Sequence, residues 1–181
     1  MKLYLSVALV GLMGLVACSL TEEECTTGNW SELGVKDGAR GLDDTHFDRY
    51  AKRCAKFDAT PDRNAWEVGR QEGLKIYCTP ANAYQLGKKG RRLRSSCAAD
   101  LAAKMQIAYD DGRELYDIQR DIQSARSDLR DAHEIAATAA ADSPQVAKAH
   151  SDIFFLRAEI QRLEWRYDRK EAELDRKYIR G

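Results

Sequence analysis

Three absences narrow what this sequence can encode. It contains no G-x-S-x-G, S-x-x-K or H-E-x-x-H signature and no glycine-rich loop after a strand. Its charge is balanced, with 29 basic and 29 acidic residues, so nothing global points to nucleic acid. After the N-terminal apolar run, no second run is long enough to cross a bilayer. We therefore expect a protein without catalytic activity, cofactor or nucleic-acid partner.

The N-terminus has the pattern of an export signal. Lys2 precedes an apolar stretch of about 14 residues, which is too short to span a bilayer core. The stretch ends in Leu15-Val16-Ala17-Cys18, which matches the bacterial lipobox. We predict a signal peptide over residues 1–17, removed before a lipidated Cys18. An ordinary signal peptide with a chance cysteine, or a buried apolar helix, is the alternative.

Lipidation at Cys18 would anchor the mature chain to a membrane without spanning it, because two or more acyl chains bind stably. Ser19 follows this cysteine. By resemblance to the sorting rule of enterobacterial lipoproteins, a residue other than Asp here favours the outer membrane, facing the periplasm. We therefore expect a membrane partner through the lipid, at the cell envelope.

Four further cysteines remain, and an even number in an exported chain indicates disulfides. Antiparallel helices beginning near Asn29 and Thr45 would bring Cys25 and Cys54 to one end, which leaves Cys78 to pair with Cys97. Three connectivities are possible, and we predict this one. A four-cysteine zinc site is the alternative, although the chain lacks a C-x-x-C pair.

Helix-start signals and glycines dominate the first half of the mature chain. Residues 18–28 read as a lipidated tether and 29–97 as a cysteine-containing helical domain. The predicted helix starts are Asn29, Thr45, Thr60-Pro61 and Thr79-Pro80. Because glycine disfavours a helix interior, the pairs Gly34/Gly38 and Gly69/Gly73 indicate close packing of helix backbones.

These residues also carry a resemblance. The order Trp30-x-x-x-Gly34-x-x-Asp37-Gly38, Thr60-Pro61-Asp62, Gly69-x-x-x-Gly73-Leu74-x-x-Tyr77-Cys78-Thr79-Pro80 and Tyr109-x-x-Gly112-Arg113-x-Leu115-Tyr116 resembles the bacterial lipoprotein family of domain of unknown function 2799. The resemblance covers roughly residues 25 to 130. It supports the envelope location and the cysteine pattern, and it implies no activity, cofactor or catalytic residue.

Residues 98–181 read as a coiled-coil helical hairpin. Apolar residues recur at heptad spacing from Leu115 to Ala136 and again from Val146 to Leu174. Ser143-Pro144 interrupts the pattern with an N-cap and a first-turn proline. Folding near residue 141 would set Leu129 against Ile153 and Ile122 against Ile160. A long parallel dimer is the alternative, and Pro144 argues against it.

Two clusters of polar residues are weak candidates for binding. His133 and His150 would lie side by side in this hairpin and, with Glu134, could hold a metal or sense pH; solvated coiled-coil positions are the alternative. The densest basic run contains Lys88, Lys89, Arg91, Arg92 and Arg94. It suits phosphates of lipid headgroups, unless it is an ordinary solvated loop.

We therefore expect an all-α protein, with a small disulfide-braced, glycine-punctuated domain followed by a long antiparallel hairpin. Its expected role is structural or interactive, with an unidentified envelope protein as partner. An anion- or lipid-binding module that uses the basic run Lys88 to Arg94 is the alternative function.

Overall fold

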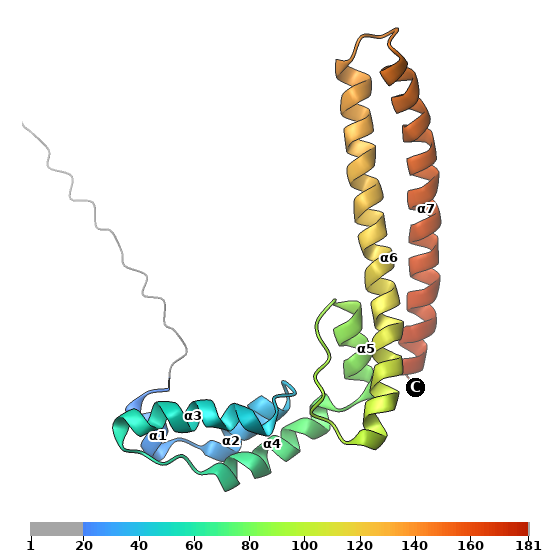
Figure 1. The fold of residues 1–181 in the computed structure, drawn as a ribbon. Helices are drawn as coiled ribbons and strands as arrows, with labels where there is room; N and C mark the ends of the chain where they lie inside the picture. The colour runs from blue at the N-terminus through green and yellow to red at the C-terminus, as the bar shows by residue number, and fades with distance from the viewer. Residues whose placement is uncertain (1–19, 181) are drawn as a thin grey trace, which may run out of the picture.

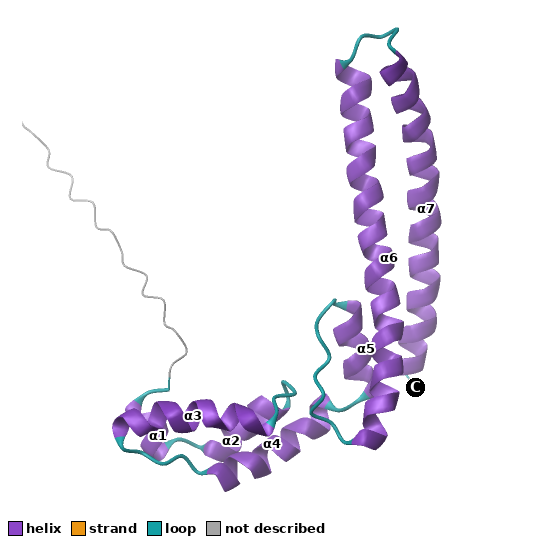
Figure 2. Ribbon diagram, in the orientation of Figure 1, coloured by secondary structure: helices purple, strands orange, loops and turns teal. Residues whose placement is uncertain are grey.

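The structure is a computed structural model that describes residues 20–180. Within these residues the backbone forms seven α-helices, two 3₁₀ turns and no strand (Figure 2). The helices form two arms that meet at an angle (Figure 1). None of the described helices is both long and apolar enough to cross a membrane. The predicted all-α fold with a long helical pair is therefore confirmed.

The shorter arm, which we call the head, contains four helices. Its frame is α2 (Trp30–Gly38) packed on α4 (Arg63–Tyr77), and it is completed by α1 (Glu22–Thr27) and α3 (Phe47–Cys54). Short 3₁₀ turns, η1 (Asp44–His46) and η2 (Ala55–Phe57), flank α3. The core of the head is a cluster made of two cysteines and three aromatic rings: Cys25, Trp30, Phe47, Cys54 and Trp66.

Three predicted helix starts are confirmed. The side chains of Asn29, Thr79 and Ser143 each accept a hydrogen bond from a backbone N–H three residues further on. Pro80 and Pro144 occupy the first turn of the helices that follow, α5 (Pro80–Lys88) and α7 (Pro144–Tyr178). Proline is favoured there because the first helical N–H groups have no partner within the helix.

Two other predicted starts are wrong. Helix α4 does not start at Thr60-Pro61 but after Asp62, whose carboxylate accepts from the N–H three residues on at 2.9 Å. A carboxylate is a better N-cap than threonine and also favours the positive end of the helix dipole. Thr45 lies inside η1 and donates its hydroxyl to Asp43 at 2.6 Å, so α3 starts only at Phe47.

The predicted glycine contact is the main feature of the head. Gly34 and Gly38 of α2 face Gly69 and Gly73 of α4. A Cβ on Gly38 would lie 2.1 Å from a carbonyl oxygen of α4, and a Cβ on Gly73 would lie 2.2 Å from one of α2. The two helices therefore pack backbone against backbone, without side chains between them.

The same contact occurs a second time, between α5 and α6 (Ala99–Thr138). A Cβ on Gly87 or Gly112 would lie 2.2 Å from a carbonyl oxygen of the opposite helix. The two nearest backbone atoms at Gly87 and at Gly112 correspond in position to those at Gly38 and Gly73. The faint repeat in the sequence is thus a tandem pair of glycine-packed helical hairpins, α2–α4 and α5–α6.

The turns after α2 and α5, the first helices of the two hairpins, are alike as well. Gly41 follows α2 with φ 69°, and Gly90 follows α5 with φ 64°. A Cβ at Gly41 would lie 2.4 Å from the ring of Tyr77, and one at Gly90 would lie 2.4 Å from the ring of Tyr116. Both positions need glycine for two reasons. The backbone is left-handed there, and a side chain would clash with the tyrosine ring that covers the turn.

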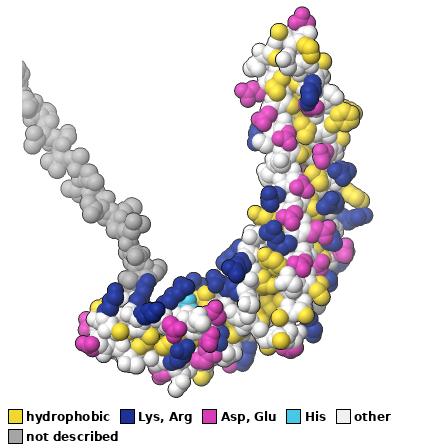
Figure 3. All heavy atoms as spheres, in the orientation of Figure 1, with side chains coloured by type: hydrophobic (Ala, Val, Ile, Leu, Met, Phe, Trp, Pro, Cys, Tyr) yellow, Lys and Arg dark blue, Asp and Glu magenta, His cyan; other side chains and the backbone are white. Residues whose placement is uncertain are grey.

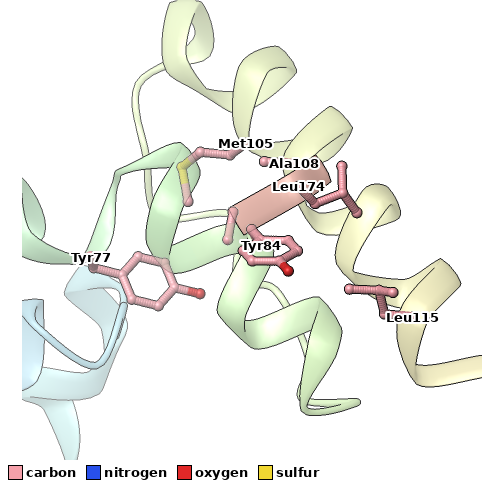
Figure 4. Close-up of a cluster of buried hydrophobic side chains, with 7 residues drawn as sticks. Tyr77, Tyr84, Met105, Ala108, Leu115 and Leu174 are labelled. Atoms are coloured by element: carbon pink, nitrogen blue, oxygen red, sulfur yellow. The ribbon is translucent and has the colours of Figure 1, made fainter. Parts of the chain in front are cut away.

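Helix α5 packs along α6, although it falls inside the predicted 29–97 domain. It makes few contacts with α4. The buried cluster beneath it takes residues from α4, α5, α6 and α7: Tyr77, Ala83, Tyr84, Met105, Ala108, Leu115 and Leu174 (Figure 4). By packing, therefore, the second unit begins near Thr79, at the start of α5.

The longer arm is the predicted antiparallel hairpin of α6 and α7, which form their seam within one chain. Ile118 and Ile122 cluster with Leu163, and Tyr167 packs against them. Leu163, three residues beyond Ile160, the predicted partner of Ile122, thus shares one cluster with Ile118 and Ile122. The buried residues of the seam follow the predicted heptad positions: Leu115, Ile118, Ile122, Ala125, Ala132, Val146, Ala149, Ile153, Ile160, Leu163 and Leu174.

Both disulfides join the predicted partners, Cys25 with Cys54 and Cys78 with Cys97. In each case one cysteine precedes the first helix of a glycine-packed hairpin and the other lies in the connection to its second helix. Each bond therefore closes the loop of one repeat and restricts the unfolded chain.

Candidate interaction surfaces

The predicted lipidation residue, Cys18, lies outside the described residues. The chain just after Cys18 contacts the head, because Leu20 packs against the buried cluster there. Thr21 and Glu24 form a capping box at the start of α1, with hydrogen bonds of 2.7 and 3.2 Å. From residue 20 onward, the predicted tether is thus part of the head. A lipid at Cys18 would hold the head itself close to a membrane.

A buried carboxylate lies at the centre of the head. Asp37 is fully buried, and its Oδ2 accepts from Tyr50 Oη at 2.7 Å and from Trp66 Nε1 at 3.0 Å. Its Oδ1 has no hydrogen-bond partner among the described residues and lies 3.6 Å from the guanidinium of Arg40. Burial and the hydrogen bond to Asp37 raise the pKa of Tyr50. The residue that corresponds in the second repeat is Leu86, so the helix contact does not itself require a carboxylate.

Lys88, the first residue of the predicted anion-binding run, is engaged within the fold. Its ammonium group pairs with Glu171 at 2.7 Å and lies 3.8 Å from Asp175. The side chain is only 21% exposed and also lies over the ring of Tyr84. Lys88 therefore ties α5 to α7 and is not available to a soluble or membrane anion.

The other four cations of the run, Lys89, Arg91, Arg92 and Arg94, are exposed. None of them makes an ion pair within residues 20–180. The loop that carries them is held in place: the N–H of Arg94 donates to Tyr77 Oη at 2.8 Å, and the loop ends at the Cys78–Cys97 disulfide. We call this segment, with its four exposed cations, the basic loop. Its backbone is held in place by these contacts.

A second group of cations lies on α3 and the 3₁₀ turn η2 that follows it, and was missed by the sequence reasoning. Arg49, Lys52, Arg53 and Lys56 are exposed, whereas Phe47 and Cys54 on the other side of the helix are buried. The spacing of these cations, at i, i+3, i+4 and i+7, is that of one helix face and was readable from the sequence. We call this group the α3 face.

His133 and His150 were only weak candidates for a metal site, and His133 has a cation as its neighbour. His133 Nε2 lies 3.3 Å from a guanidinium nitrogen of Arg157 on α7. Within residues 20–180, no group of three or more His, Cys, Asp and Glu side chains is placed to hold a metal ion. The hairpin register brings an arginine to His133, and a cation there disfavours metal binding.

The distal half of the hairpin has a groove between α6 and α7 of about 420 Å³. Its apolar lining includes Ile135, which is 44% exposed, and Phe155, which is 66% exposed. Four carboxylates surround it: Asp128, Asp131, Asp152 and Glu159. We call this feature the distal groove.

These features define a disulfide-bonded helical protein with a head and a projecting hairpin. Residues 29–114 match the family model described as Protein of unknown function (DUF2799), so this part of the chain is similar to that family. The match begins at the N-cap of α2 and ends within α6, so it spans both glycine-packed repeats but not the distal groove. No curated protein and no solved structure matches the chain.

Proposed function

We propose that this chain is an envelope-anchored lipoprotein with a structural, protein-interaction role. A lipid on Cys18 holds the head at the outer membrane, on the side that faces the periplasm. Because Leu20 already packs on the head, the lipid positions a folded domain rather than a loose end. The hairpin then projects from that domain (Figure 1) and carries its contact surface away from the head.

The observation that carries the proposal is the distal groove. Large apolar side chains in a monomeric protein are usually exposed singly, whereas a group of them at a concave surface marks an interaction site. Phe155 and Ile135 line the same groove, and the exposed ring of Phe154 contacts Phe155 at 5.5 Å between centroids. This apolar surface would be covered in a complex.

The charges around the groove indicate the kind of partner. Asp152 and Glu159 pair with Lys148 and Arg162 of the same helix. Asp128 and Asp131, by contrast, make no ion pair within residues 20–180. The occupant that fits is an amphipathic helix of an envelope protein, with apolar residues on one side and Lys or Arg beside them.

The experiment is site-specific photo-crosslinking in intact cells from position 155, followed by identification of the crosslinked peptide. A matched control places the same crosslinker at Trp165, which is also an exposed aromatic residue of α7 but does not line the groove. We expect an adduct from position 155 only, with a partner peptide that is helical in pattern and rich in Lys or Arg. Equal adducts from both positions, or a partner peptide without cations, would contradict the proposal.

Charge reversal tests the same contact independently. Asp128→Lys with Asp131→Lys should abolish the adduct, because it replaces both unpaired carboxylates with cations. The control pair is Asp110→Lys with Asp121→Lys, at exposed positions of the same helix nearer the head, and it should leave the adduct unchanged. Loss of the adduct in both pairs would show an effect of net charge and not of the groove.

Anchoring is tested separately with Cys18→Ala, followed by membrane fractionation. We expect either soluble release of the protein or accumulation of the uncleaved precursor. Normal processing with unchanged membrane retention would refute the lipoprotein part of the proposal and leave the groove to be judged on the crosslinking alone.

A further inference from the structure

Two groups of cations that are far apart in the sequence lie in neighbouring parts of the structure. The basic loop follows α5, and the α3 face belongs to the head. Ser96, at the end of the basic loop, donates its hydroxyl to the carbonyl oxygen of Gly41 in the head at 2.7 Å. In Figure 3, dark blue side chains run along the upper edge of the head to the corner where the two arms meet. Basic side chains thus line this edge of the head in the view of Figure 3.

We propose that this composite basic surface, formed by the α3 face and the basic loop, docks the head onto a bilayer that contains anionic phospholipid. The loop alone provides four cations, and the α3 face adds four more from α3 and η2. Each Lys or Arg near an anionic membrane surface strengthens binding about fivefold. The surface therefore fits a plane of phosphate groups better than a single phosphate ion.

The position of the chain's start supports this orientation. Leu20 packs against the cluster that contains Cys54, the last residue of α3. The Cys25–Cys54 disulfide ties α1 to that end of α3. If Cys18 carries a lipid, as proposed above, the lipid is attached two residues before Leu20, which packs at the Cys54 end of α3. Lipid and basic surface then act on the same membrane, as two signals of one anchor.

An exposed aromatic residue belongs to this surface as well. Phe57 follows Lys56 at the end of η2 and is 38% exposed. Aromatic rings favour the boundary between headgroups and acyl chains. The α3 face therefore provides the combination of cations and an exposed ring that is typical of interfacial membrane contacts.

The test measures flotation of the unlipidated chain, residues 19–181, with vesicles of phosphatidylglycerol and phosphatidylethanolamine in equal parts. Phosphatidylcholine vesicles serve as the neutral reference. We expect binding to the anionic vesicles only, weakened by added salt because exposed charges are screened. Inorganic phosphate at matched ionic strength should not displace the protein. Equal flotation with both vesicle types, or no flotation, would overturn the proposal.

Three double variants with the same loss of charge locate the surface. Arg91→Ala with Arg92→Ala changes the basic loop, and Lys52→Ala with Lys56→Ala changes the α3 face. Each pair should weaken vesicle binding about 30-fold. The control pair, Arg120→Ala with Arg166→Ala, removes exposed cations of the hairpin and should change binding less than about twofold by the same reasoning.

Circular dichroism should show unchanged helicity in all three variants, since every residue replaced is exposed. Equal weakening by the control pair would show that net charge alone decides binding and would refute the composite surface. Weakening by the loop pair without the α3 pair would refute it too. Because the assay uses no protein partner and no lipid on Cys18, its failure would leave the proposed interaction role of the hairpin standing.

Discussion

The glycine contact between α2 and α4 gives the sharpest prediction, because two effects of opposite sign compete at one position. In Gly73→Ala, the helix interior gains about 1 kcal/mol, since alanine has the higher helix propensity. The added Cβ would lie 2.2 Å from the Val35 carbonyl oxygen, 2.6 Å from the Ala39 nitrogen and 2.9 Å from the Gly38 Cα. Backbone atoms cannot rotate away, so the helices themselves must separate.

The required separation is large on the scale of packed interiors. Ordinary carbon contacts are about 3.5–4 Å, so α2 must move by more than about 1 Å. Overpacking a well-filled interior costs about 1–3 kcal/mol, and here every other contact along α2 weakens with it. We expect Gly73→Ala to lower the free energy of unfolding of the head by about 2 kcal/mol, net of the gain in propensity.

The assay is urea unfolding of the oxidised protein, followed by tryptophan fluorescence. Trp165→Phe in the background removes the exposed hairpin reporter, so that Trp30 and Trp66 report on the head alone. Ala103→Gly, at an exposed position of α6, calibrates the propensity effect. If Gly73→Ala stabilised the head by the amount that Ala103→Gly costs, propensity would have won and the backbone contact would be refuted.

Three further predictions concern the core and the seam. Asp37→Leu should destabilise the head by about 2 kcal/mol in urea unfolding, because the buried Trp66 and the half-buried Tyr50 lose their acceptor; a neutral result would show that the carboxylate is dispensable. The hydrogen bond from Arg70 lowers the pKa of Glu67, so the stability that Glu67→Gln removes should be present at neutral pH and vanish as pH falls through that lowered pKa; a gap that persisted in acid would contradict this. Ile122→Asp should open the hairpin more than Leu129→Asp, since the first is 3% exposed and the second only half-buried; equal losses of helicity would argue against the observed seam.

Much of this fold could be predicted from local sequence patterns that have one favourable structure. A heptad stripe interrupted by Ser143-Pro144 has one compact solution, because neither helix buries its stripe alone. Glycines spaced by four in a polar helix cost stability unless another backbone lies against them. The pairs Gly34/Gly38 and Gly69/Gly73 therefore allowed the contact between the two helices to be predicted. The predicted start at Thr60-Pro61 failed because a second capping residue, Asp62, stood close to it, and the one at Thr45 failed because Thr45 lies inside a 3₁₀ turn.

The sequence could not show which helix each element packs against, or which distant residue each side chain contacts. Nothing near α5 distinguishes packing on α4 from packing on α6, because the glycine signal is the same in both. The fate of Lys88 depends on Glu171, far away in the chain and placed by the hairpin register. The composite basic surface likewise depends on the turn at Gly41, which brings the head against the basic loop. The α3 face, in contrast, was a local helical pattern that could have been read.

Tyr77 contacts both repeats, and this helps to explain how a thin head can orient a long hairpin. Tyr77 covers Gly41 in the first repeat and belongs to the buried cluster of the second. Its hydroxyl also accepts from the N–H of Arg94 in the basic loop. Figure 4 shows its ring beside that cluster, at the boundary of the two arms. A helix as short as α2 or α5 has little stability of its own, so each depends on the backbone contact to a longer helix. Because both contacts end on neighbouring parts of one chain, the hairpin is connected to the proposed membrane-docking surface through packed helices.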